Sequence, residues 1–545
     1  MSLDRAPNSL PAWKSSLLAV LAATLLILAF PDFEFWFLAW FALVPLLWAI
    51  EREKQSTVRS FLLGWLFGTV FFFGTCWWLT FAPITYAGFP WPLAYFLMLC
   101  VCLAVGLFPA IFAAILSVLL RSLGSWAFLA APFVWVFTEF LRYWLTGNNW
   151  NALAYSQAMN STVEPSWSSL VSFEAVLFAR FGGVALVSFI GMIPNTVVAA
   201  NICLRNRRTL VVSVTTVVVS VVIFFFSAIS ALPPSEKADE KALIAAVQPN
   251  VPMSNLDQGS LERLRSRQIE SAESMLAELR KQNDYLTQSQ GRILNTGLST
   301  TAILPESPMN FMYNDDREFQ QFIGDFARRN NVSVLFNSAE PDKTNGKYFN
   351  SAVMVGPDGR EAVQYDKIYL LPFGEAVPSF LDGIVPGFVG NFSYGGEYDL
   401  FPLGDAKAGV MICFESHFGQ LSREYVRNGA DVIIEMTNDG YLGPTPVLRQ
   451  HLANAVFRAV ETNRPVLRVT NVGVTAYINE SGAVIDPAPT YVEATRVWSV
   501  RRSDGEQTFY VRYGDWFAWL CSAVTLVLIV LTLRRRREVA EARTK

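Results

Sequence analysis

The pattern of apolar and polar positions divides this chain into a long apolar first part and a mixed second part. Runs of about 20 apolar residues, the length that crosses bilayer hydrocarbon as a helix, recur up to about residue 230 and return once near the C-terminus. We therefore expect a multi-span α-helical membrane domain with about eight helices. The predicted spans are 15–31, 34–50, 60–82, 91–120, 125–145, 170–203, 209–230 and 516–533.

Lysine and arginine fall on one side of this eight-span path. Short positively charged loops stay in the cytoplasm, so both termini are expected to be cytoplasmic and the segment after Ser230 to face outward. The first apolar run has no clear cleavage site and leads straight into further spans, which favours an uncleaved first helix. The residues that set the orientation are Arg5, Lys14, Arg52, Lys54, Arg59, Arg121, Arg205, Arg207, Arg208 and Arg534 to Arg537.

Between residues 231 and 515 short apolar strands alternate with amphipathic helices, which predicts a layered α/β domain. The resulting division is a membrane domain 1–230, an extracytoplasmic domain 231–515, a last span 516–533 and a basic tail 534–545. Expected helices cover 260–281, 316–329, 418–428 and 446–462. Expected strands cover 242–248, 300–304, 333–337, 350–356, 361–365, 408–413, 431–436, 465–470 and 475–480.

The amino-acid composition excludes several kinds of partner and of site. The 545 residues are 52% hydrophobic and only 16% charged, as in a membrane protein, and the net charge of −3 argues against a nucleic-acid partner. Five of the six cysteines lie in apolar runs, which leaves Cys413 alone in the polar part. With two histidines and no metal-ligand spacing, we expect no disulfide and no metal site.

Candidate reactive residues follow apolar strands. Cys413 stands at a predicted strand-to-helix turn, where helix amides would lower its thiol pKa, although a buried structural cysteine fits that position equally well. Glu306, Lys367 and Glu375 also come after strands, and the carboxyl ends of strands are where α/β sheets gather ligands. Two of these residues also have a plainer interpretation: Glu306 could be a turn residue before Pro308, and Lys367 could be a solvated strand end.

Four ordered motifs resemble the Glu-Lys-Cys triad of the nitrilase superfamily. They are Pro-Glu-Ser (305–307), Tyr-Asp-Lys (365–367), Pro-Phe-Gly-Glu (372–375) and Ile-Cys-Phe-Glu (412–415). Within that superfamily the multi-span apolipoprotein N-acyltransferases match best, over essentially the whole chain. Further resemblance lies in 139–142, 348–352, 437–444, 450–451, 458–465 and 470–473.

The resemblance implies an αββα sandwich and a role for each residue. Cys413 would be the nucleophile, Glu306 the general base and Lys367 the group that holds the developing oxyanion, while Glu375 and Glu415 would orient Lys367 and the incoming amine. The family's reaction takes an acyl chain from a phospholipid such as phosphatidylethanolamine, through a thioester, to the α-amine of a diacylated apolipoprotein. It takes place at the bacterial inner membrane, and it needs no cofactor or metal.

Two stretches depart from the family. Relatives carry a tryptophan-bearing arm after the segment equivalent to 247–252, where this chain reads Met-Ser-Asn-Leu-Asp (253–257). Relatives also have Trp-Phe-Gly where this chain has Tyr-Leu-Gly (441–443). The first difference bears on the lipid contact of the arm, and the second on the shape of the pocket.

Two further features have alternative interpretations. The apolar but glycine- and proline-broken stretch 379–396 predicts a loop that dips into the outer leaflet and admits lipid, or else a satellite core. Its apolar residues include Phe380, Leu381, Phe388 and Phe392. Glu139 and Arg142 form an ion pair or help to line a headgroup site.

Three other functions compete with acyl transfer. A membrane-tethered amidase or nitrilase-type hydrolase would keep the triad and use water as the acceptor. A transporter would carry more charges within its spans than are found here. A lipoprotein-binding module would tolerate replacement of Cys413.

Overall fold

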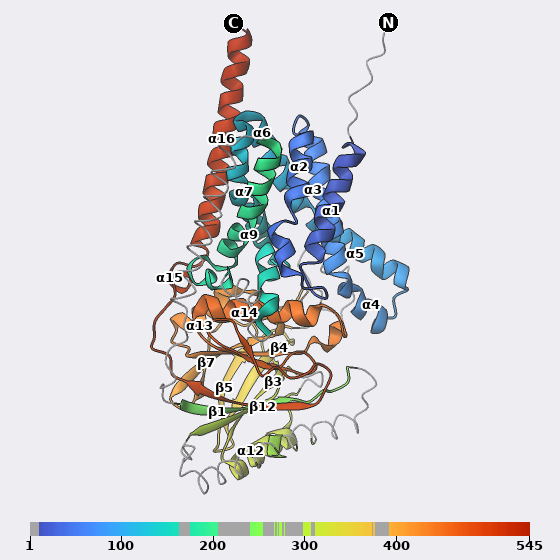
Figure 1. Ribbon diagram of the computed structural model, residues 1–545. Coiled ribbons are helices and arrows are strands. Elements are labelled where there is room, and N and C mark those ends of the chain that lie inside the picture. Colours follow the sequence, from blue (N-terminus) through green and yellow to red (C-terminus); the bar gives the residue numbers. More distant parts are fainter. Residues whose placement is uncertain are drawn as a thin grey trace. The chain divides into compact units, whose positions relative to one another are not determined.

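The computed structural model describes residues 10–162, 175–204, 240–253, 298–306, 311–372, 374–376 and 392–544, with a few positions between 266 and 277. The chain divides into two compact units (Figure 1). Unit 1 comprises Met1–Leu232, Thr445–Ala453 and Tyr513–Lys545, and unit 2 comprises Pro233–Pro444 and Asn454–Arg512. The predicted span 209–230 and nearly all of the predicted helix 260–281 lie outside the described residues.

Unit 1 is helical. Helix α3 packs against α1 and α6, and α7 packs against α6, α9 and α16. Its α-helices are α1 (Trp13–Ile27), α2 (Val44–Glu53), α3 (Thr57–Thr75), α4 (Phe81–Thr85), α5 (Trp91–Val105), α6 (Leu107–Leu123), α7 (Ala127–Thr146), α9 (Ala179–Leu204) and α16 (Trp516–Thr544). The 3₁₀ helices are η1 (Trp36–Trp40), η2 (Trp77–Thr80), η3 (Gly124–Trp126) and η4 (Leu153–Thr162).

The close approach of α3 and α6 depends on glycine. A Cβ at Gly64 would lie 2.3 Å from the carbonyl oxygen of Pro109, and one at Gly68 would lie 2.9 Å from the Cα of Gly106. Small residues four apart let two membrane helices pack backbone to backbone. Pro109 also explains why the predicted span 91–120 is broken at Gly106, because its ring clashes with the carbonyl four residues earlier.

The predicted number of spans is only partly supported. Four helical stretches among the described residues are long and apolar enough to cross a membrane: Thr57–Thr75, Trp91–Thr146, Ala179–Cys203 and Trp516–Glu538. The predicted span 34–50 is not one helix, since α2 begins only at Val44 with Pro45 in its first turn, where proline is favoured. Helix α16 continues from the predicted span 516–533 into the predicted basic tail as far as Thr544.

Unit 2 is an α/β domain with two six-stranded sheets, as the alternation of strands and helices predicts. The first sheet has the order β12-β1-β2-β3-β4-β5 and the second β11-β10-β9-β8-β7-β6. The first contains β1 (Glu240–Gln248), β2 (Ser299–Ile303), β3 (Ser333–Pro341), β4 (Tyr348–Val355), β5 (Glu361–Asp366) and β12 (Ala494–Arg501). The second contains β6 (Leu400–Leu403), β7 (Ala406–Ile412), β8 (Val432–Thr437), β9 (Val466–Thr470), β10 (Ala476–Ile478) and β11 (Val484–Ile485).

The two sheets pack against each other, with helices on the outside. Strands β1, β2 and β4 contact β9, β6 and β7 respectively, while α12 covers the first sheet and α13 the second. The predicted helices 316–329, 418–428 and 446–462 correspond to the observed ones. These are α12 (Arg317–Asn330), α13 (Gly419–Arg427) and α14 (Val447–Thr462), with η6 (Cys413–His417), η7 (Asp439–Leu442) and α15 (Phe509–Tyr513) as further short helices.

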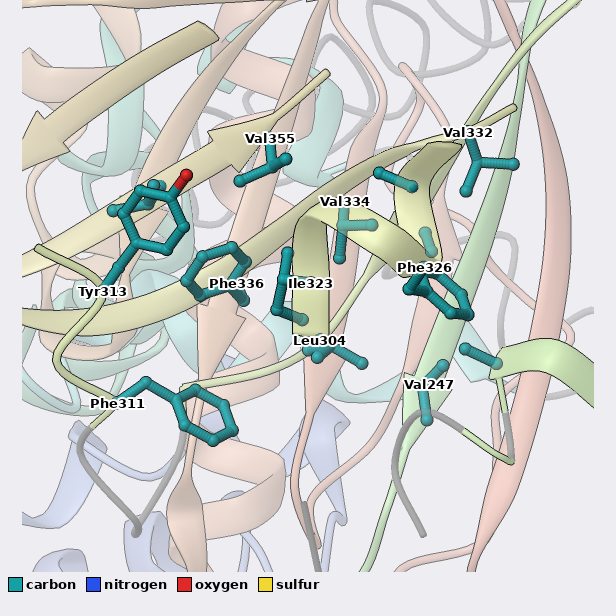
Figure 2. Close-up of a cluster of buried hydrophobic side chains, with 14 of the residues drawn as sticks. Val247, Leu304, Phe311, Tyr313, Ile323, Phe326, Val332, Val334, Phe336 and Val355 are labelled. Carbon is teal, nitrogen blue, oxygen red and sulfur yellow. The ribbon is translucent and has the colours of Figure 1, made fainter. Parts of the chain in front are cut away.

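The core between α12 and the first sheet shows why this helix forms. Phe319, Ile323, Phe326 and Ala327 are buried at a helical spacing, which gives α12 one apolar face. That face packs onto alternating side chains of the sheet (Figure 2), namely Val247, Leu304, Val334, Phe336, Val353 and Val355. The Asp316 side chain accepts a hydrogen bond from the amide of Phe319, at 3.0 Å, and so caps the helix start.

Candidate active site

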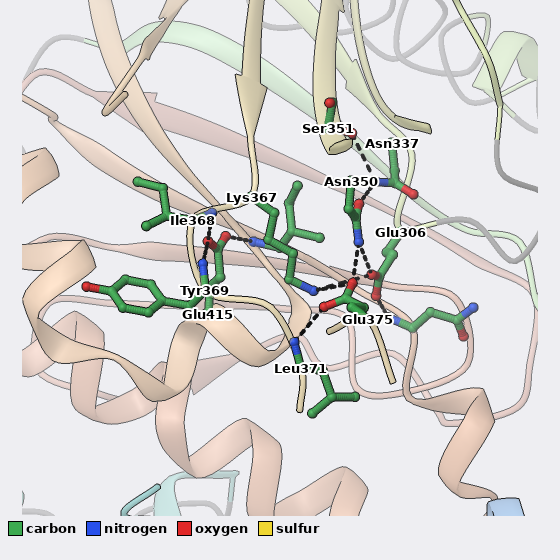
Figure 3. Close-up of polar contacts among 12 residues, drawn as sticks. Glu306, Asn337, Asn350, Ser351, Lys367, Ile368, Tyr369, Leu371, Glu375 and Glu415 are labelled. Atoms are coloured by element: carbon green, nitrogen blue, oxygen red, sulfur yellow. Dashed lines mark hydrogen bonds and ion pairs between the residues drawn. The ribbon is translucent and has the colours of Figure 1, made fainter. Parts of the chain in front are cut away.

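The sheet topology brings the predicted residues together. Glu306 follows β2, Lys367 follows β5 and Cys413 follows β7, so all three lie just beyond strand ends. Glu375 belongs to the turn that follows Lys367, and Glu415 lies within η6. Figure 3 shows Lys367, Glu306 and Glu375 pointing toward one another, with Glu415 on the other side of the Lys367 backbone. All five side chains belong to unit 2.

Lys367 is a buried cation between two carboxylates. Its Nζ lies 2.8 Å from Glu375 Oε1 and 3.9 Å from Glu306 Oε1, and its side chain is 1% exposed. Burial alone would lower the pKa of this amine, but the charges of Glu375 and Glu306 outweigh that effect and raise the pKa above its usual value. Lys367 therefore keeps a positive charge in a site largely closed to water.

Glu306 is held by three donors. Its Oε1 accepts from Asn350 Nδ2 at 3.2 Å, its Oε2 accepts from the amide of Asn438 at 3.1 Å, and Cys413 adds a side-chain hydrogen bond. Burial raises the pKa of Glu306, and Lys367 opposes that rise. A carboxyl group with a raised pKa, bonded to a thiol, is suited to taking up the thiol proton.

Cys413 occupies a left-handed backbone position, with φ of 53°. A residue other than glycine rarely adopts this conformation, which costs on the order of 1 kcal/mol. Here it turns the chain sharply from β7 into η6. The expectation that helix amides lower the thiol pKa is wrong, because burial and the Glu306 charge raise the pKa of Cys413 well above its usual value. The five-residue η6 is too short to offset them, so the thiol needs a base.

Glu415 ties the Lys367 segment to the Cys413 turn. Its Oε1 accepts from Tyr365 Oη at 2.7 Å, from the amide of Ile368 at 2.8 Å and from the amide of Tyr369 at 3.0 Å. Its Oε2 accepts from the amide of Ile412 at 2.8 Å. This fully buried carboxyl group thus positions the backbone on both sides of the site.

The raised pKa of Glu415 predicts that the stability of unit 2 depends on pH. Burial raises the pKa of Glu415 to about 7, against a usual value of 4.5. The stabilisation from its protonated form is complete below about 4.5 and is lost as the pH rises through about 7. The loss is at most a few kcal/mol, at about 1.4 kcal/mol per pKa unit.

Thermal unfolding of wild type and Glu415→Gln between pH 4.5 and 8 measures this effect, because glutamine cannot titrate. We expect the stability of wild type relative to the variant to fall as the pH rises. A difference independent of pH would contradict the assignment. Asp358→Asn, at an exposed turn, serves as the control.

Asn350 is a site residue to which the sequence analysis assigned no role. Its Nδ2 donates to Glu375 Oε1 at 2.6 Å as well as to Glu306, and its Oδ1 accepts from Asn337 at 2.6 Å. The Asn337 bond fixes which end of the Asn350 amide faces the carboxylates. The motif 348–352 was the only signal for Asn350 in the sequence.

A buried ion cluster beside Cys413 was also missed. Arg468 lies 2.5 Å from Glu435 Oε1 and 2.8 Å from Asp439 Oδ2, and all three side chains are at most 1% exposed. Glu435 on β8 is directly paired with Arg468 on β9. The sequence did contain a signal for this cluster, because one charged residue stands within each of two apolar strands, Glu435 in β8 and Arg468 in β9. The Asp439 charge contributes to the raised pKa of Cys413.

A second buried ion pair holds the turn that begins at Cys413. Arg458 Nη1 donates to the carbonyl oxygens of Ser416 and His417, at 3.2 and 3.1 Å. These are the last two residues of η6. Arg458 Nη2 lies 2.7 Å from Glu461 Oε2, one turn along α14. Arg458 thereby supports the strained backbone of Cys413 from the far end of the 3₁₀ helix.

Most of the predicted lipid loop lies outside the described residues. Phe380, Leu381 and Phe388 lie outside the described residues, as do residues 254–257 of the arm. Phe392 is described: its backbone bridges to Tyr348 and its amide donates to the carbonyl of Glu375 at 3.4 Å. Phe392 therefore lies beside the site, while the lipid-entry role of this stretch stays a prediction.

Glu139 and Arg142 do not form a direct ion pair among the described side chains of unit 1. Glu139 Oε1 accepts from Trp135 Nε1 and from the amide of Leu153, both at 2.9 Å. Arg142 donates to Asn149 at 3.3 Å and lies 4.9 Å above the Phe72 ring. Both charged residues line one largely apolar pocket.

Comparisons with known proteins cover nearly the whole chain. Residues 22–197 match the apolipoprotein N-acyltransferase N-terminal domain, and residues 270–510 match the carbon-nitrogen hydrolase family. The chain is 30% identical over 536 residues to the apolipoprotein N-acyltransferase of Geobacter metallireducens, covering 95% of each chain. It is 28% identical over 540 residues to that of Thermotoga maritima, covering 96% of this chain and 95% of the other. Among solved structures it is similar to Saccharomyces cerevisiae Nit3, of the nitrilase superfamily, with TM-score 0.34, 16% identity and coverage of 52% of this chain and 97% of that one.

Proposed function

The chain belongs to the apolipoprotein N-acyltransferase family, and on that premise we propose how it performs acyl transfer. The donor is a phospholipid of the phosphatidylethanolamine class. The acceptor is the α-amine of an N-terminal diacylglyceryl-cysteine, and the reaction passes through a thioester on Cys413. The observation that carries the proposal is the Cys413 thiol bonded to Glu306, with the Lys367 ammonium group beside both.

In the first half-reaction Glu306 takes the thiol proton as Cys413 Sγ attacks the ester carbonyl of the phospholipid. Lys367 stabilises the negative charge that develops on the carbonyl oxygen, an effect worth a few kcal/mol in a site that excludes water. The C–O ester bond then breaks. The leaving alkoxide takes the proton back from Glu306, so a lysophospholipid departs and the acyl chain remains on sulfur.

In the second half-reaction the α-amine of the lipoprotein attacks the thioester carbonyl. Glu306 takes the proton that the amine loses, and Lys367 again faces the developing oxyanion. The C–S bond breaks, the thiolate regains a proton from Glu306, and the amide product leaves. Glu375 and Asn350 position Lys367 and Glu306 throughout, which is supported by their hydrogen bonds to those two residues.

The proposed location is the bacterial inner membrane. The distribution of Lys and Arg favours eight spans, with both termini cytoplasmic and unit 2 in the periplasm. The four apolar helical stretches support the embedding of unit 1. An outward-facing unit 2 would meet lipoproteins after their export.

A product analysis tests the order of the two steps. Purified protein is mixed with acyl-labelled phosphatidylethanolamine, first without and then with a diacylated lipopeptide. We expect a burst of about one lysophospholipid per enzyme without acceptor, as for a ping-pong enzyme. With acceptor, labelled triacylated lipopeptide should form in a 1:1 ratio to lysophospholipid.

Free fatty acid as the main labelled product would instead identify a hydrolase with water as the acceptor. Lysophospholipid that forms only when both substrates are present would contradict the thioester route.

A further inference from the structure

Four consecutive arginines directly follow the apolar part of α16. Its apolar part, from Trp516 to Leu533, is about 27 Å long at 1.5 Å per residue, close to the thickness of bilayer hydrocarbon. Arg534 to Arg537 follow at once, and the helix continues beyond them to Thr544. In a bilayer that covers this apolar part, the arginines would lie at the depth of the lipid headgroups.

One of these arginines meets a fixed arginine of α6. Arg536 Nε donates to Ser122 Oγ at 3.3 Å. The neighbouring Arg121 donates to the carbonyl of Gln55 at 3.2 Å and to Thr57 Oγ1 at 2.5 Å, which anchors it to the start of α3. Arg121 and Arg536 lie close enough for their positive charges to repel each other. Two helices thus hold a pair of like charges side by side.

Two of the acidic residues described near this end of unit 1, Glu51 and Glu53, already have partners. Glu51 pairs with Lys54 at 2.6 Å, and Glu53 pairs with Arg59 at 3.1 Å. Within the part of the chain that the structure describes, neither Arg121 nor Arg536 has a carboxylate within ion-pair distance. An anion from outside the chain would offset the repulsion between them, and guanidinium groups match phosphate oxygens in geometry as well as in charge.

We propose that Arg121, Arg536 and the Ser122 hydroxyl bind the phosphodiester of an anionic phospholipid of the phosphatidylglycerol class. The apolar flank of the site favours a lipid over free phosphate, because α16 exposes a row of aliphatic side chains just before the arginines. Trp126, which is 75% exposed near the end of α6, suits the membrane interface. The exposed aliphatic residues are Leu526, Val527, Val530, Leu531 and Leu533.

The experiment measures lipid binding to the full-length protein in mixed micelles by native mass spectrometry. Phosphatidylglycerol is compared with phosphatidylethanolamine. The site variant is Arg121→Gln/Arg536→Gln, and the matched control Arg534→Gln/Arg535→Gln removes the same charge from the same end. We expect a preference for phosphatidylglycerol in wild type and control, and a loss of about 10-fold or more in affinity for the site variant.

Several results would overturn the proposal. An equal loss in both double variants would mean diffuse attraction to a basic helix end. Wild type that binds both lipids equally, or loses phosphatidylglycerol to equimolar inorganic phosphate, would also refute it. Arg536→Gln alone serves as a second variant that should fold, because Arg536 is exposed and its described side-chain hydrogen bond is the one to Ser122. Its thermal unfolding should equal that of wild type while its preference for phosphatidylglycerol falls.

Discussion

Cys413→Ser is expected to lower the rate of lipopeptide acylation on the order of 10⁴-fold or more. The hydroxyl occupies the position of the thiol but is a much weaker nucleophile. It is therefore not expected to form an acyl-enzyme at a measurable rate. Because serine is close to cysteine in size and tolerates the same backbone, the fold of unit 2 should persist.

The decisive measurement is the intact mass of the purified protein after exposure to phospholipid. Wild type should carry an acyl adduct that maps to Cys413 and disappears when diacylated lipopeptide is added, whereas Cys413→Ser should carry none. The matched control is Cys100→Ser, at an exposed position on α5, which should keep both adduct and rate. Adduct formation by Cys413→Ser, or its turnover at the wild-type rate, would exclude Cys413 as the nucleophile.

Lys367→Met is expected to abolish acyl transfer and to destabilise unit 2 by about 3–5 kcal/mol, the usual cost of removing one partner of a buried ion pair. The substitution leaves Glu306 and Glu375 buried with no cation between them. Activity falls for a different reason, since no positive charge remains to meet the oxyanion.

The double variant Lys367→Met/Glu375→Gln separates these two effects. Neutralising Glu375 restores the charge balance, so most of the lost stability should return in thermal unfolding. Activity should stay absent, because the oxyanion still lacks its partner. If the double variant recovered activity together with stability, Lys367 would have a purely structural role.

The convergence of the site was predictable from sequence because the reactive residues stand directly after apolar strands. Cys413 ends the predicted strand 408–413 and Lys367 comes two residues after 361–365, and strand ends of a layered α/β domain meet at shared edges. The helices α12, α13 and α14 were predictable for a similar reason, since their apolar positions recur at a helical period.

The ionisation of the site was not predictable, because it depends on neighbours that are distant in the chain. The position of Cys413 before a helix pointed to a lowered thiol pKa, but burial and the Glu306 charge reverse the shift. Asn350 and Arg458 act through hydrogen bonds to residues 44 and 42 positions away. The break in the predicted span 91–120 could not be predicted from hydropathy either, since Pro109 interrupts an apolar run without changing its hydropathy.

The boundary between the two units has a practical consequence, since it falls inside a single helix. The first turns of α14 belong to unit 1, where Gln450 accepts from Trp78 and Trp150 and Arg449 pairs with Glu34. Cutting the gene at residues 232 and 512 would therefore give a fragment that carries these side chains away from their partners. A soluble version of the catalytic unit would need a redesigned surface at 445–453, besides new ends.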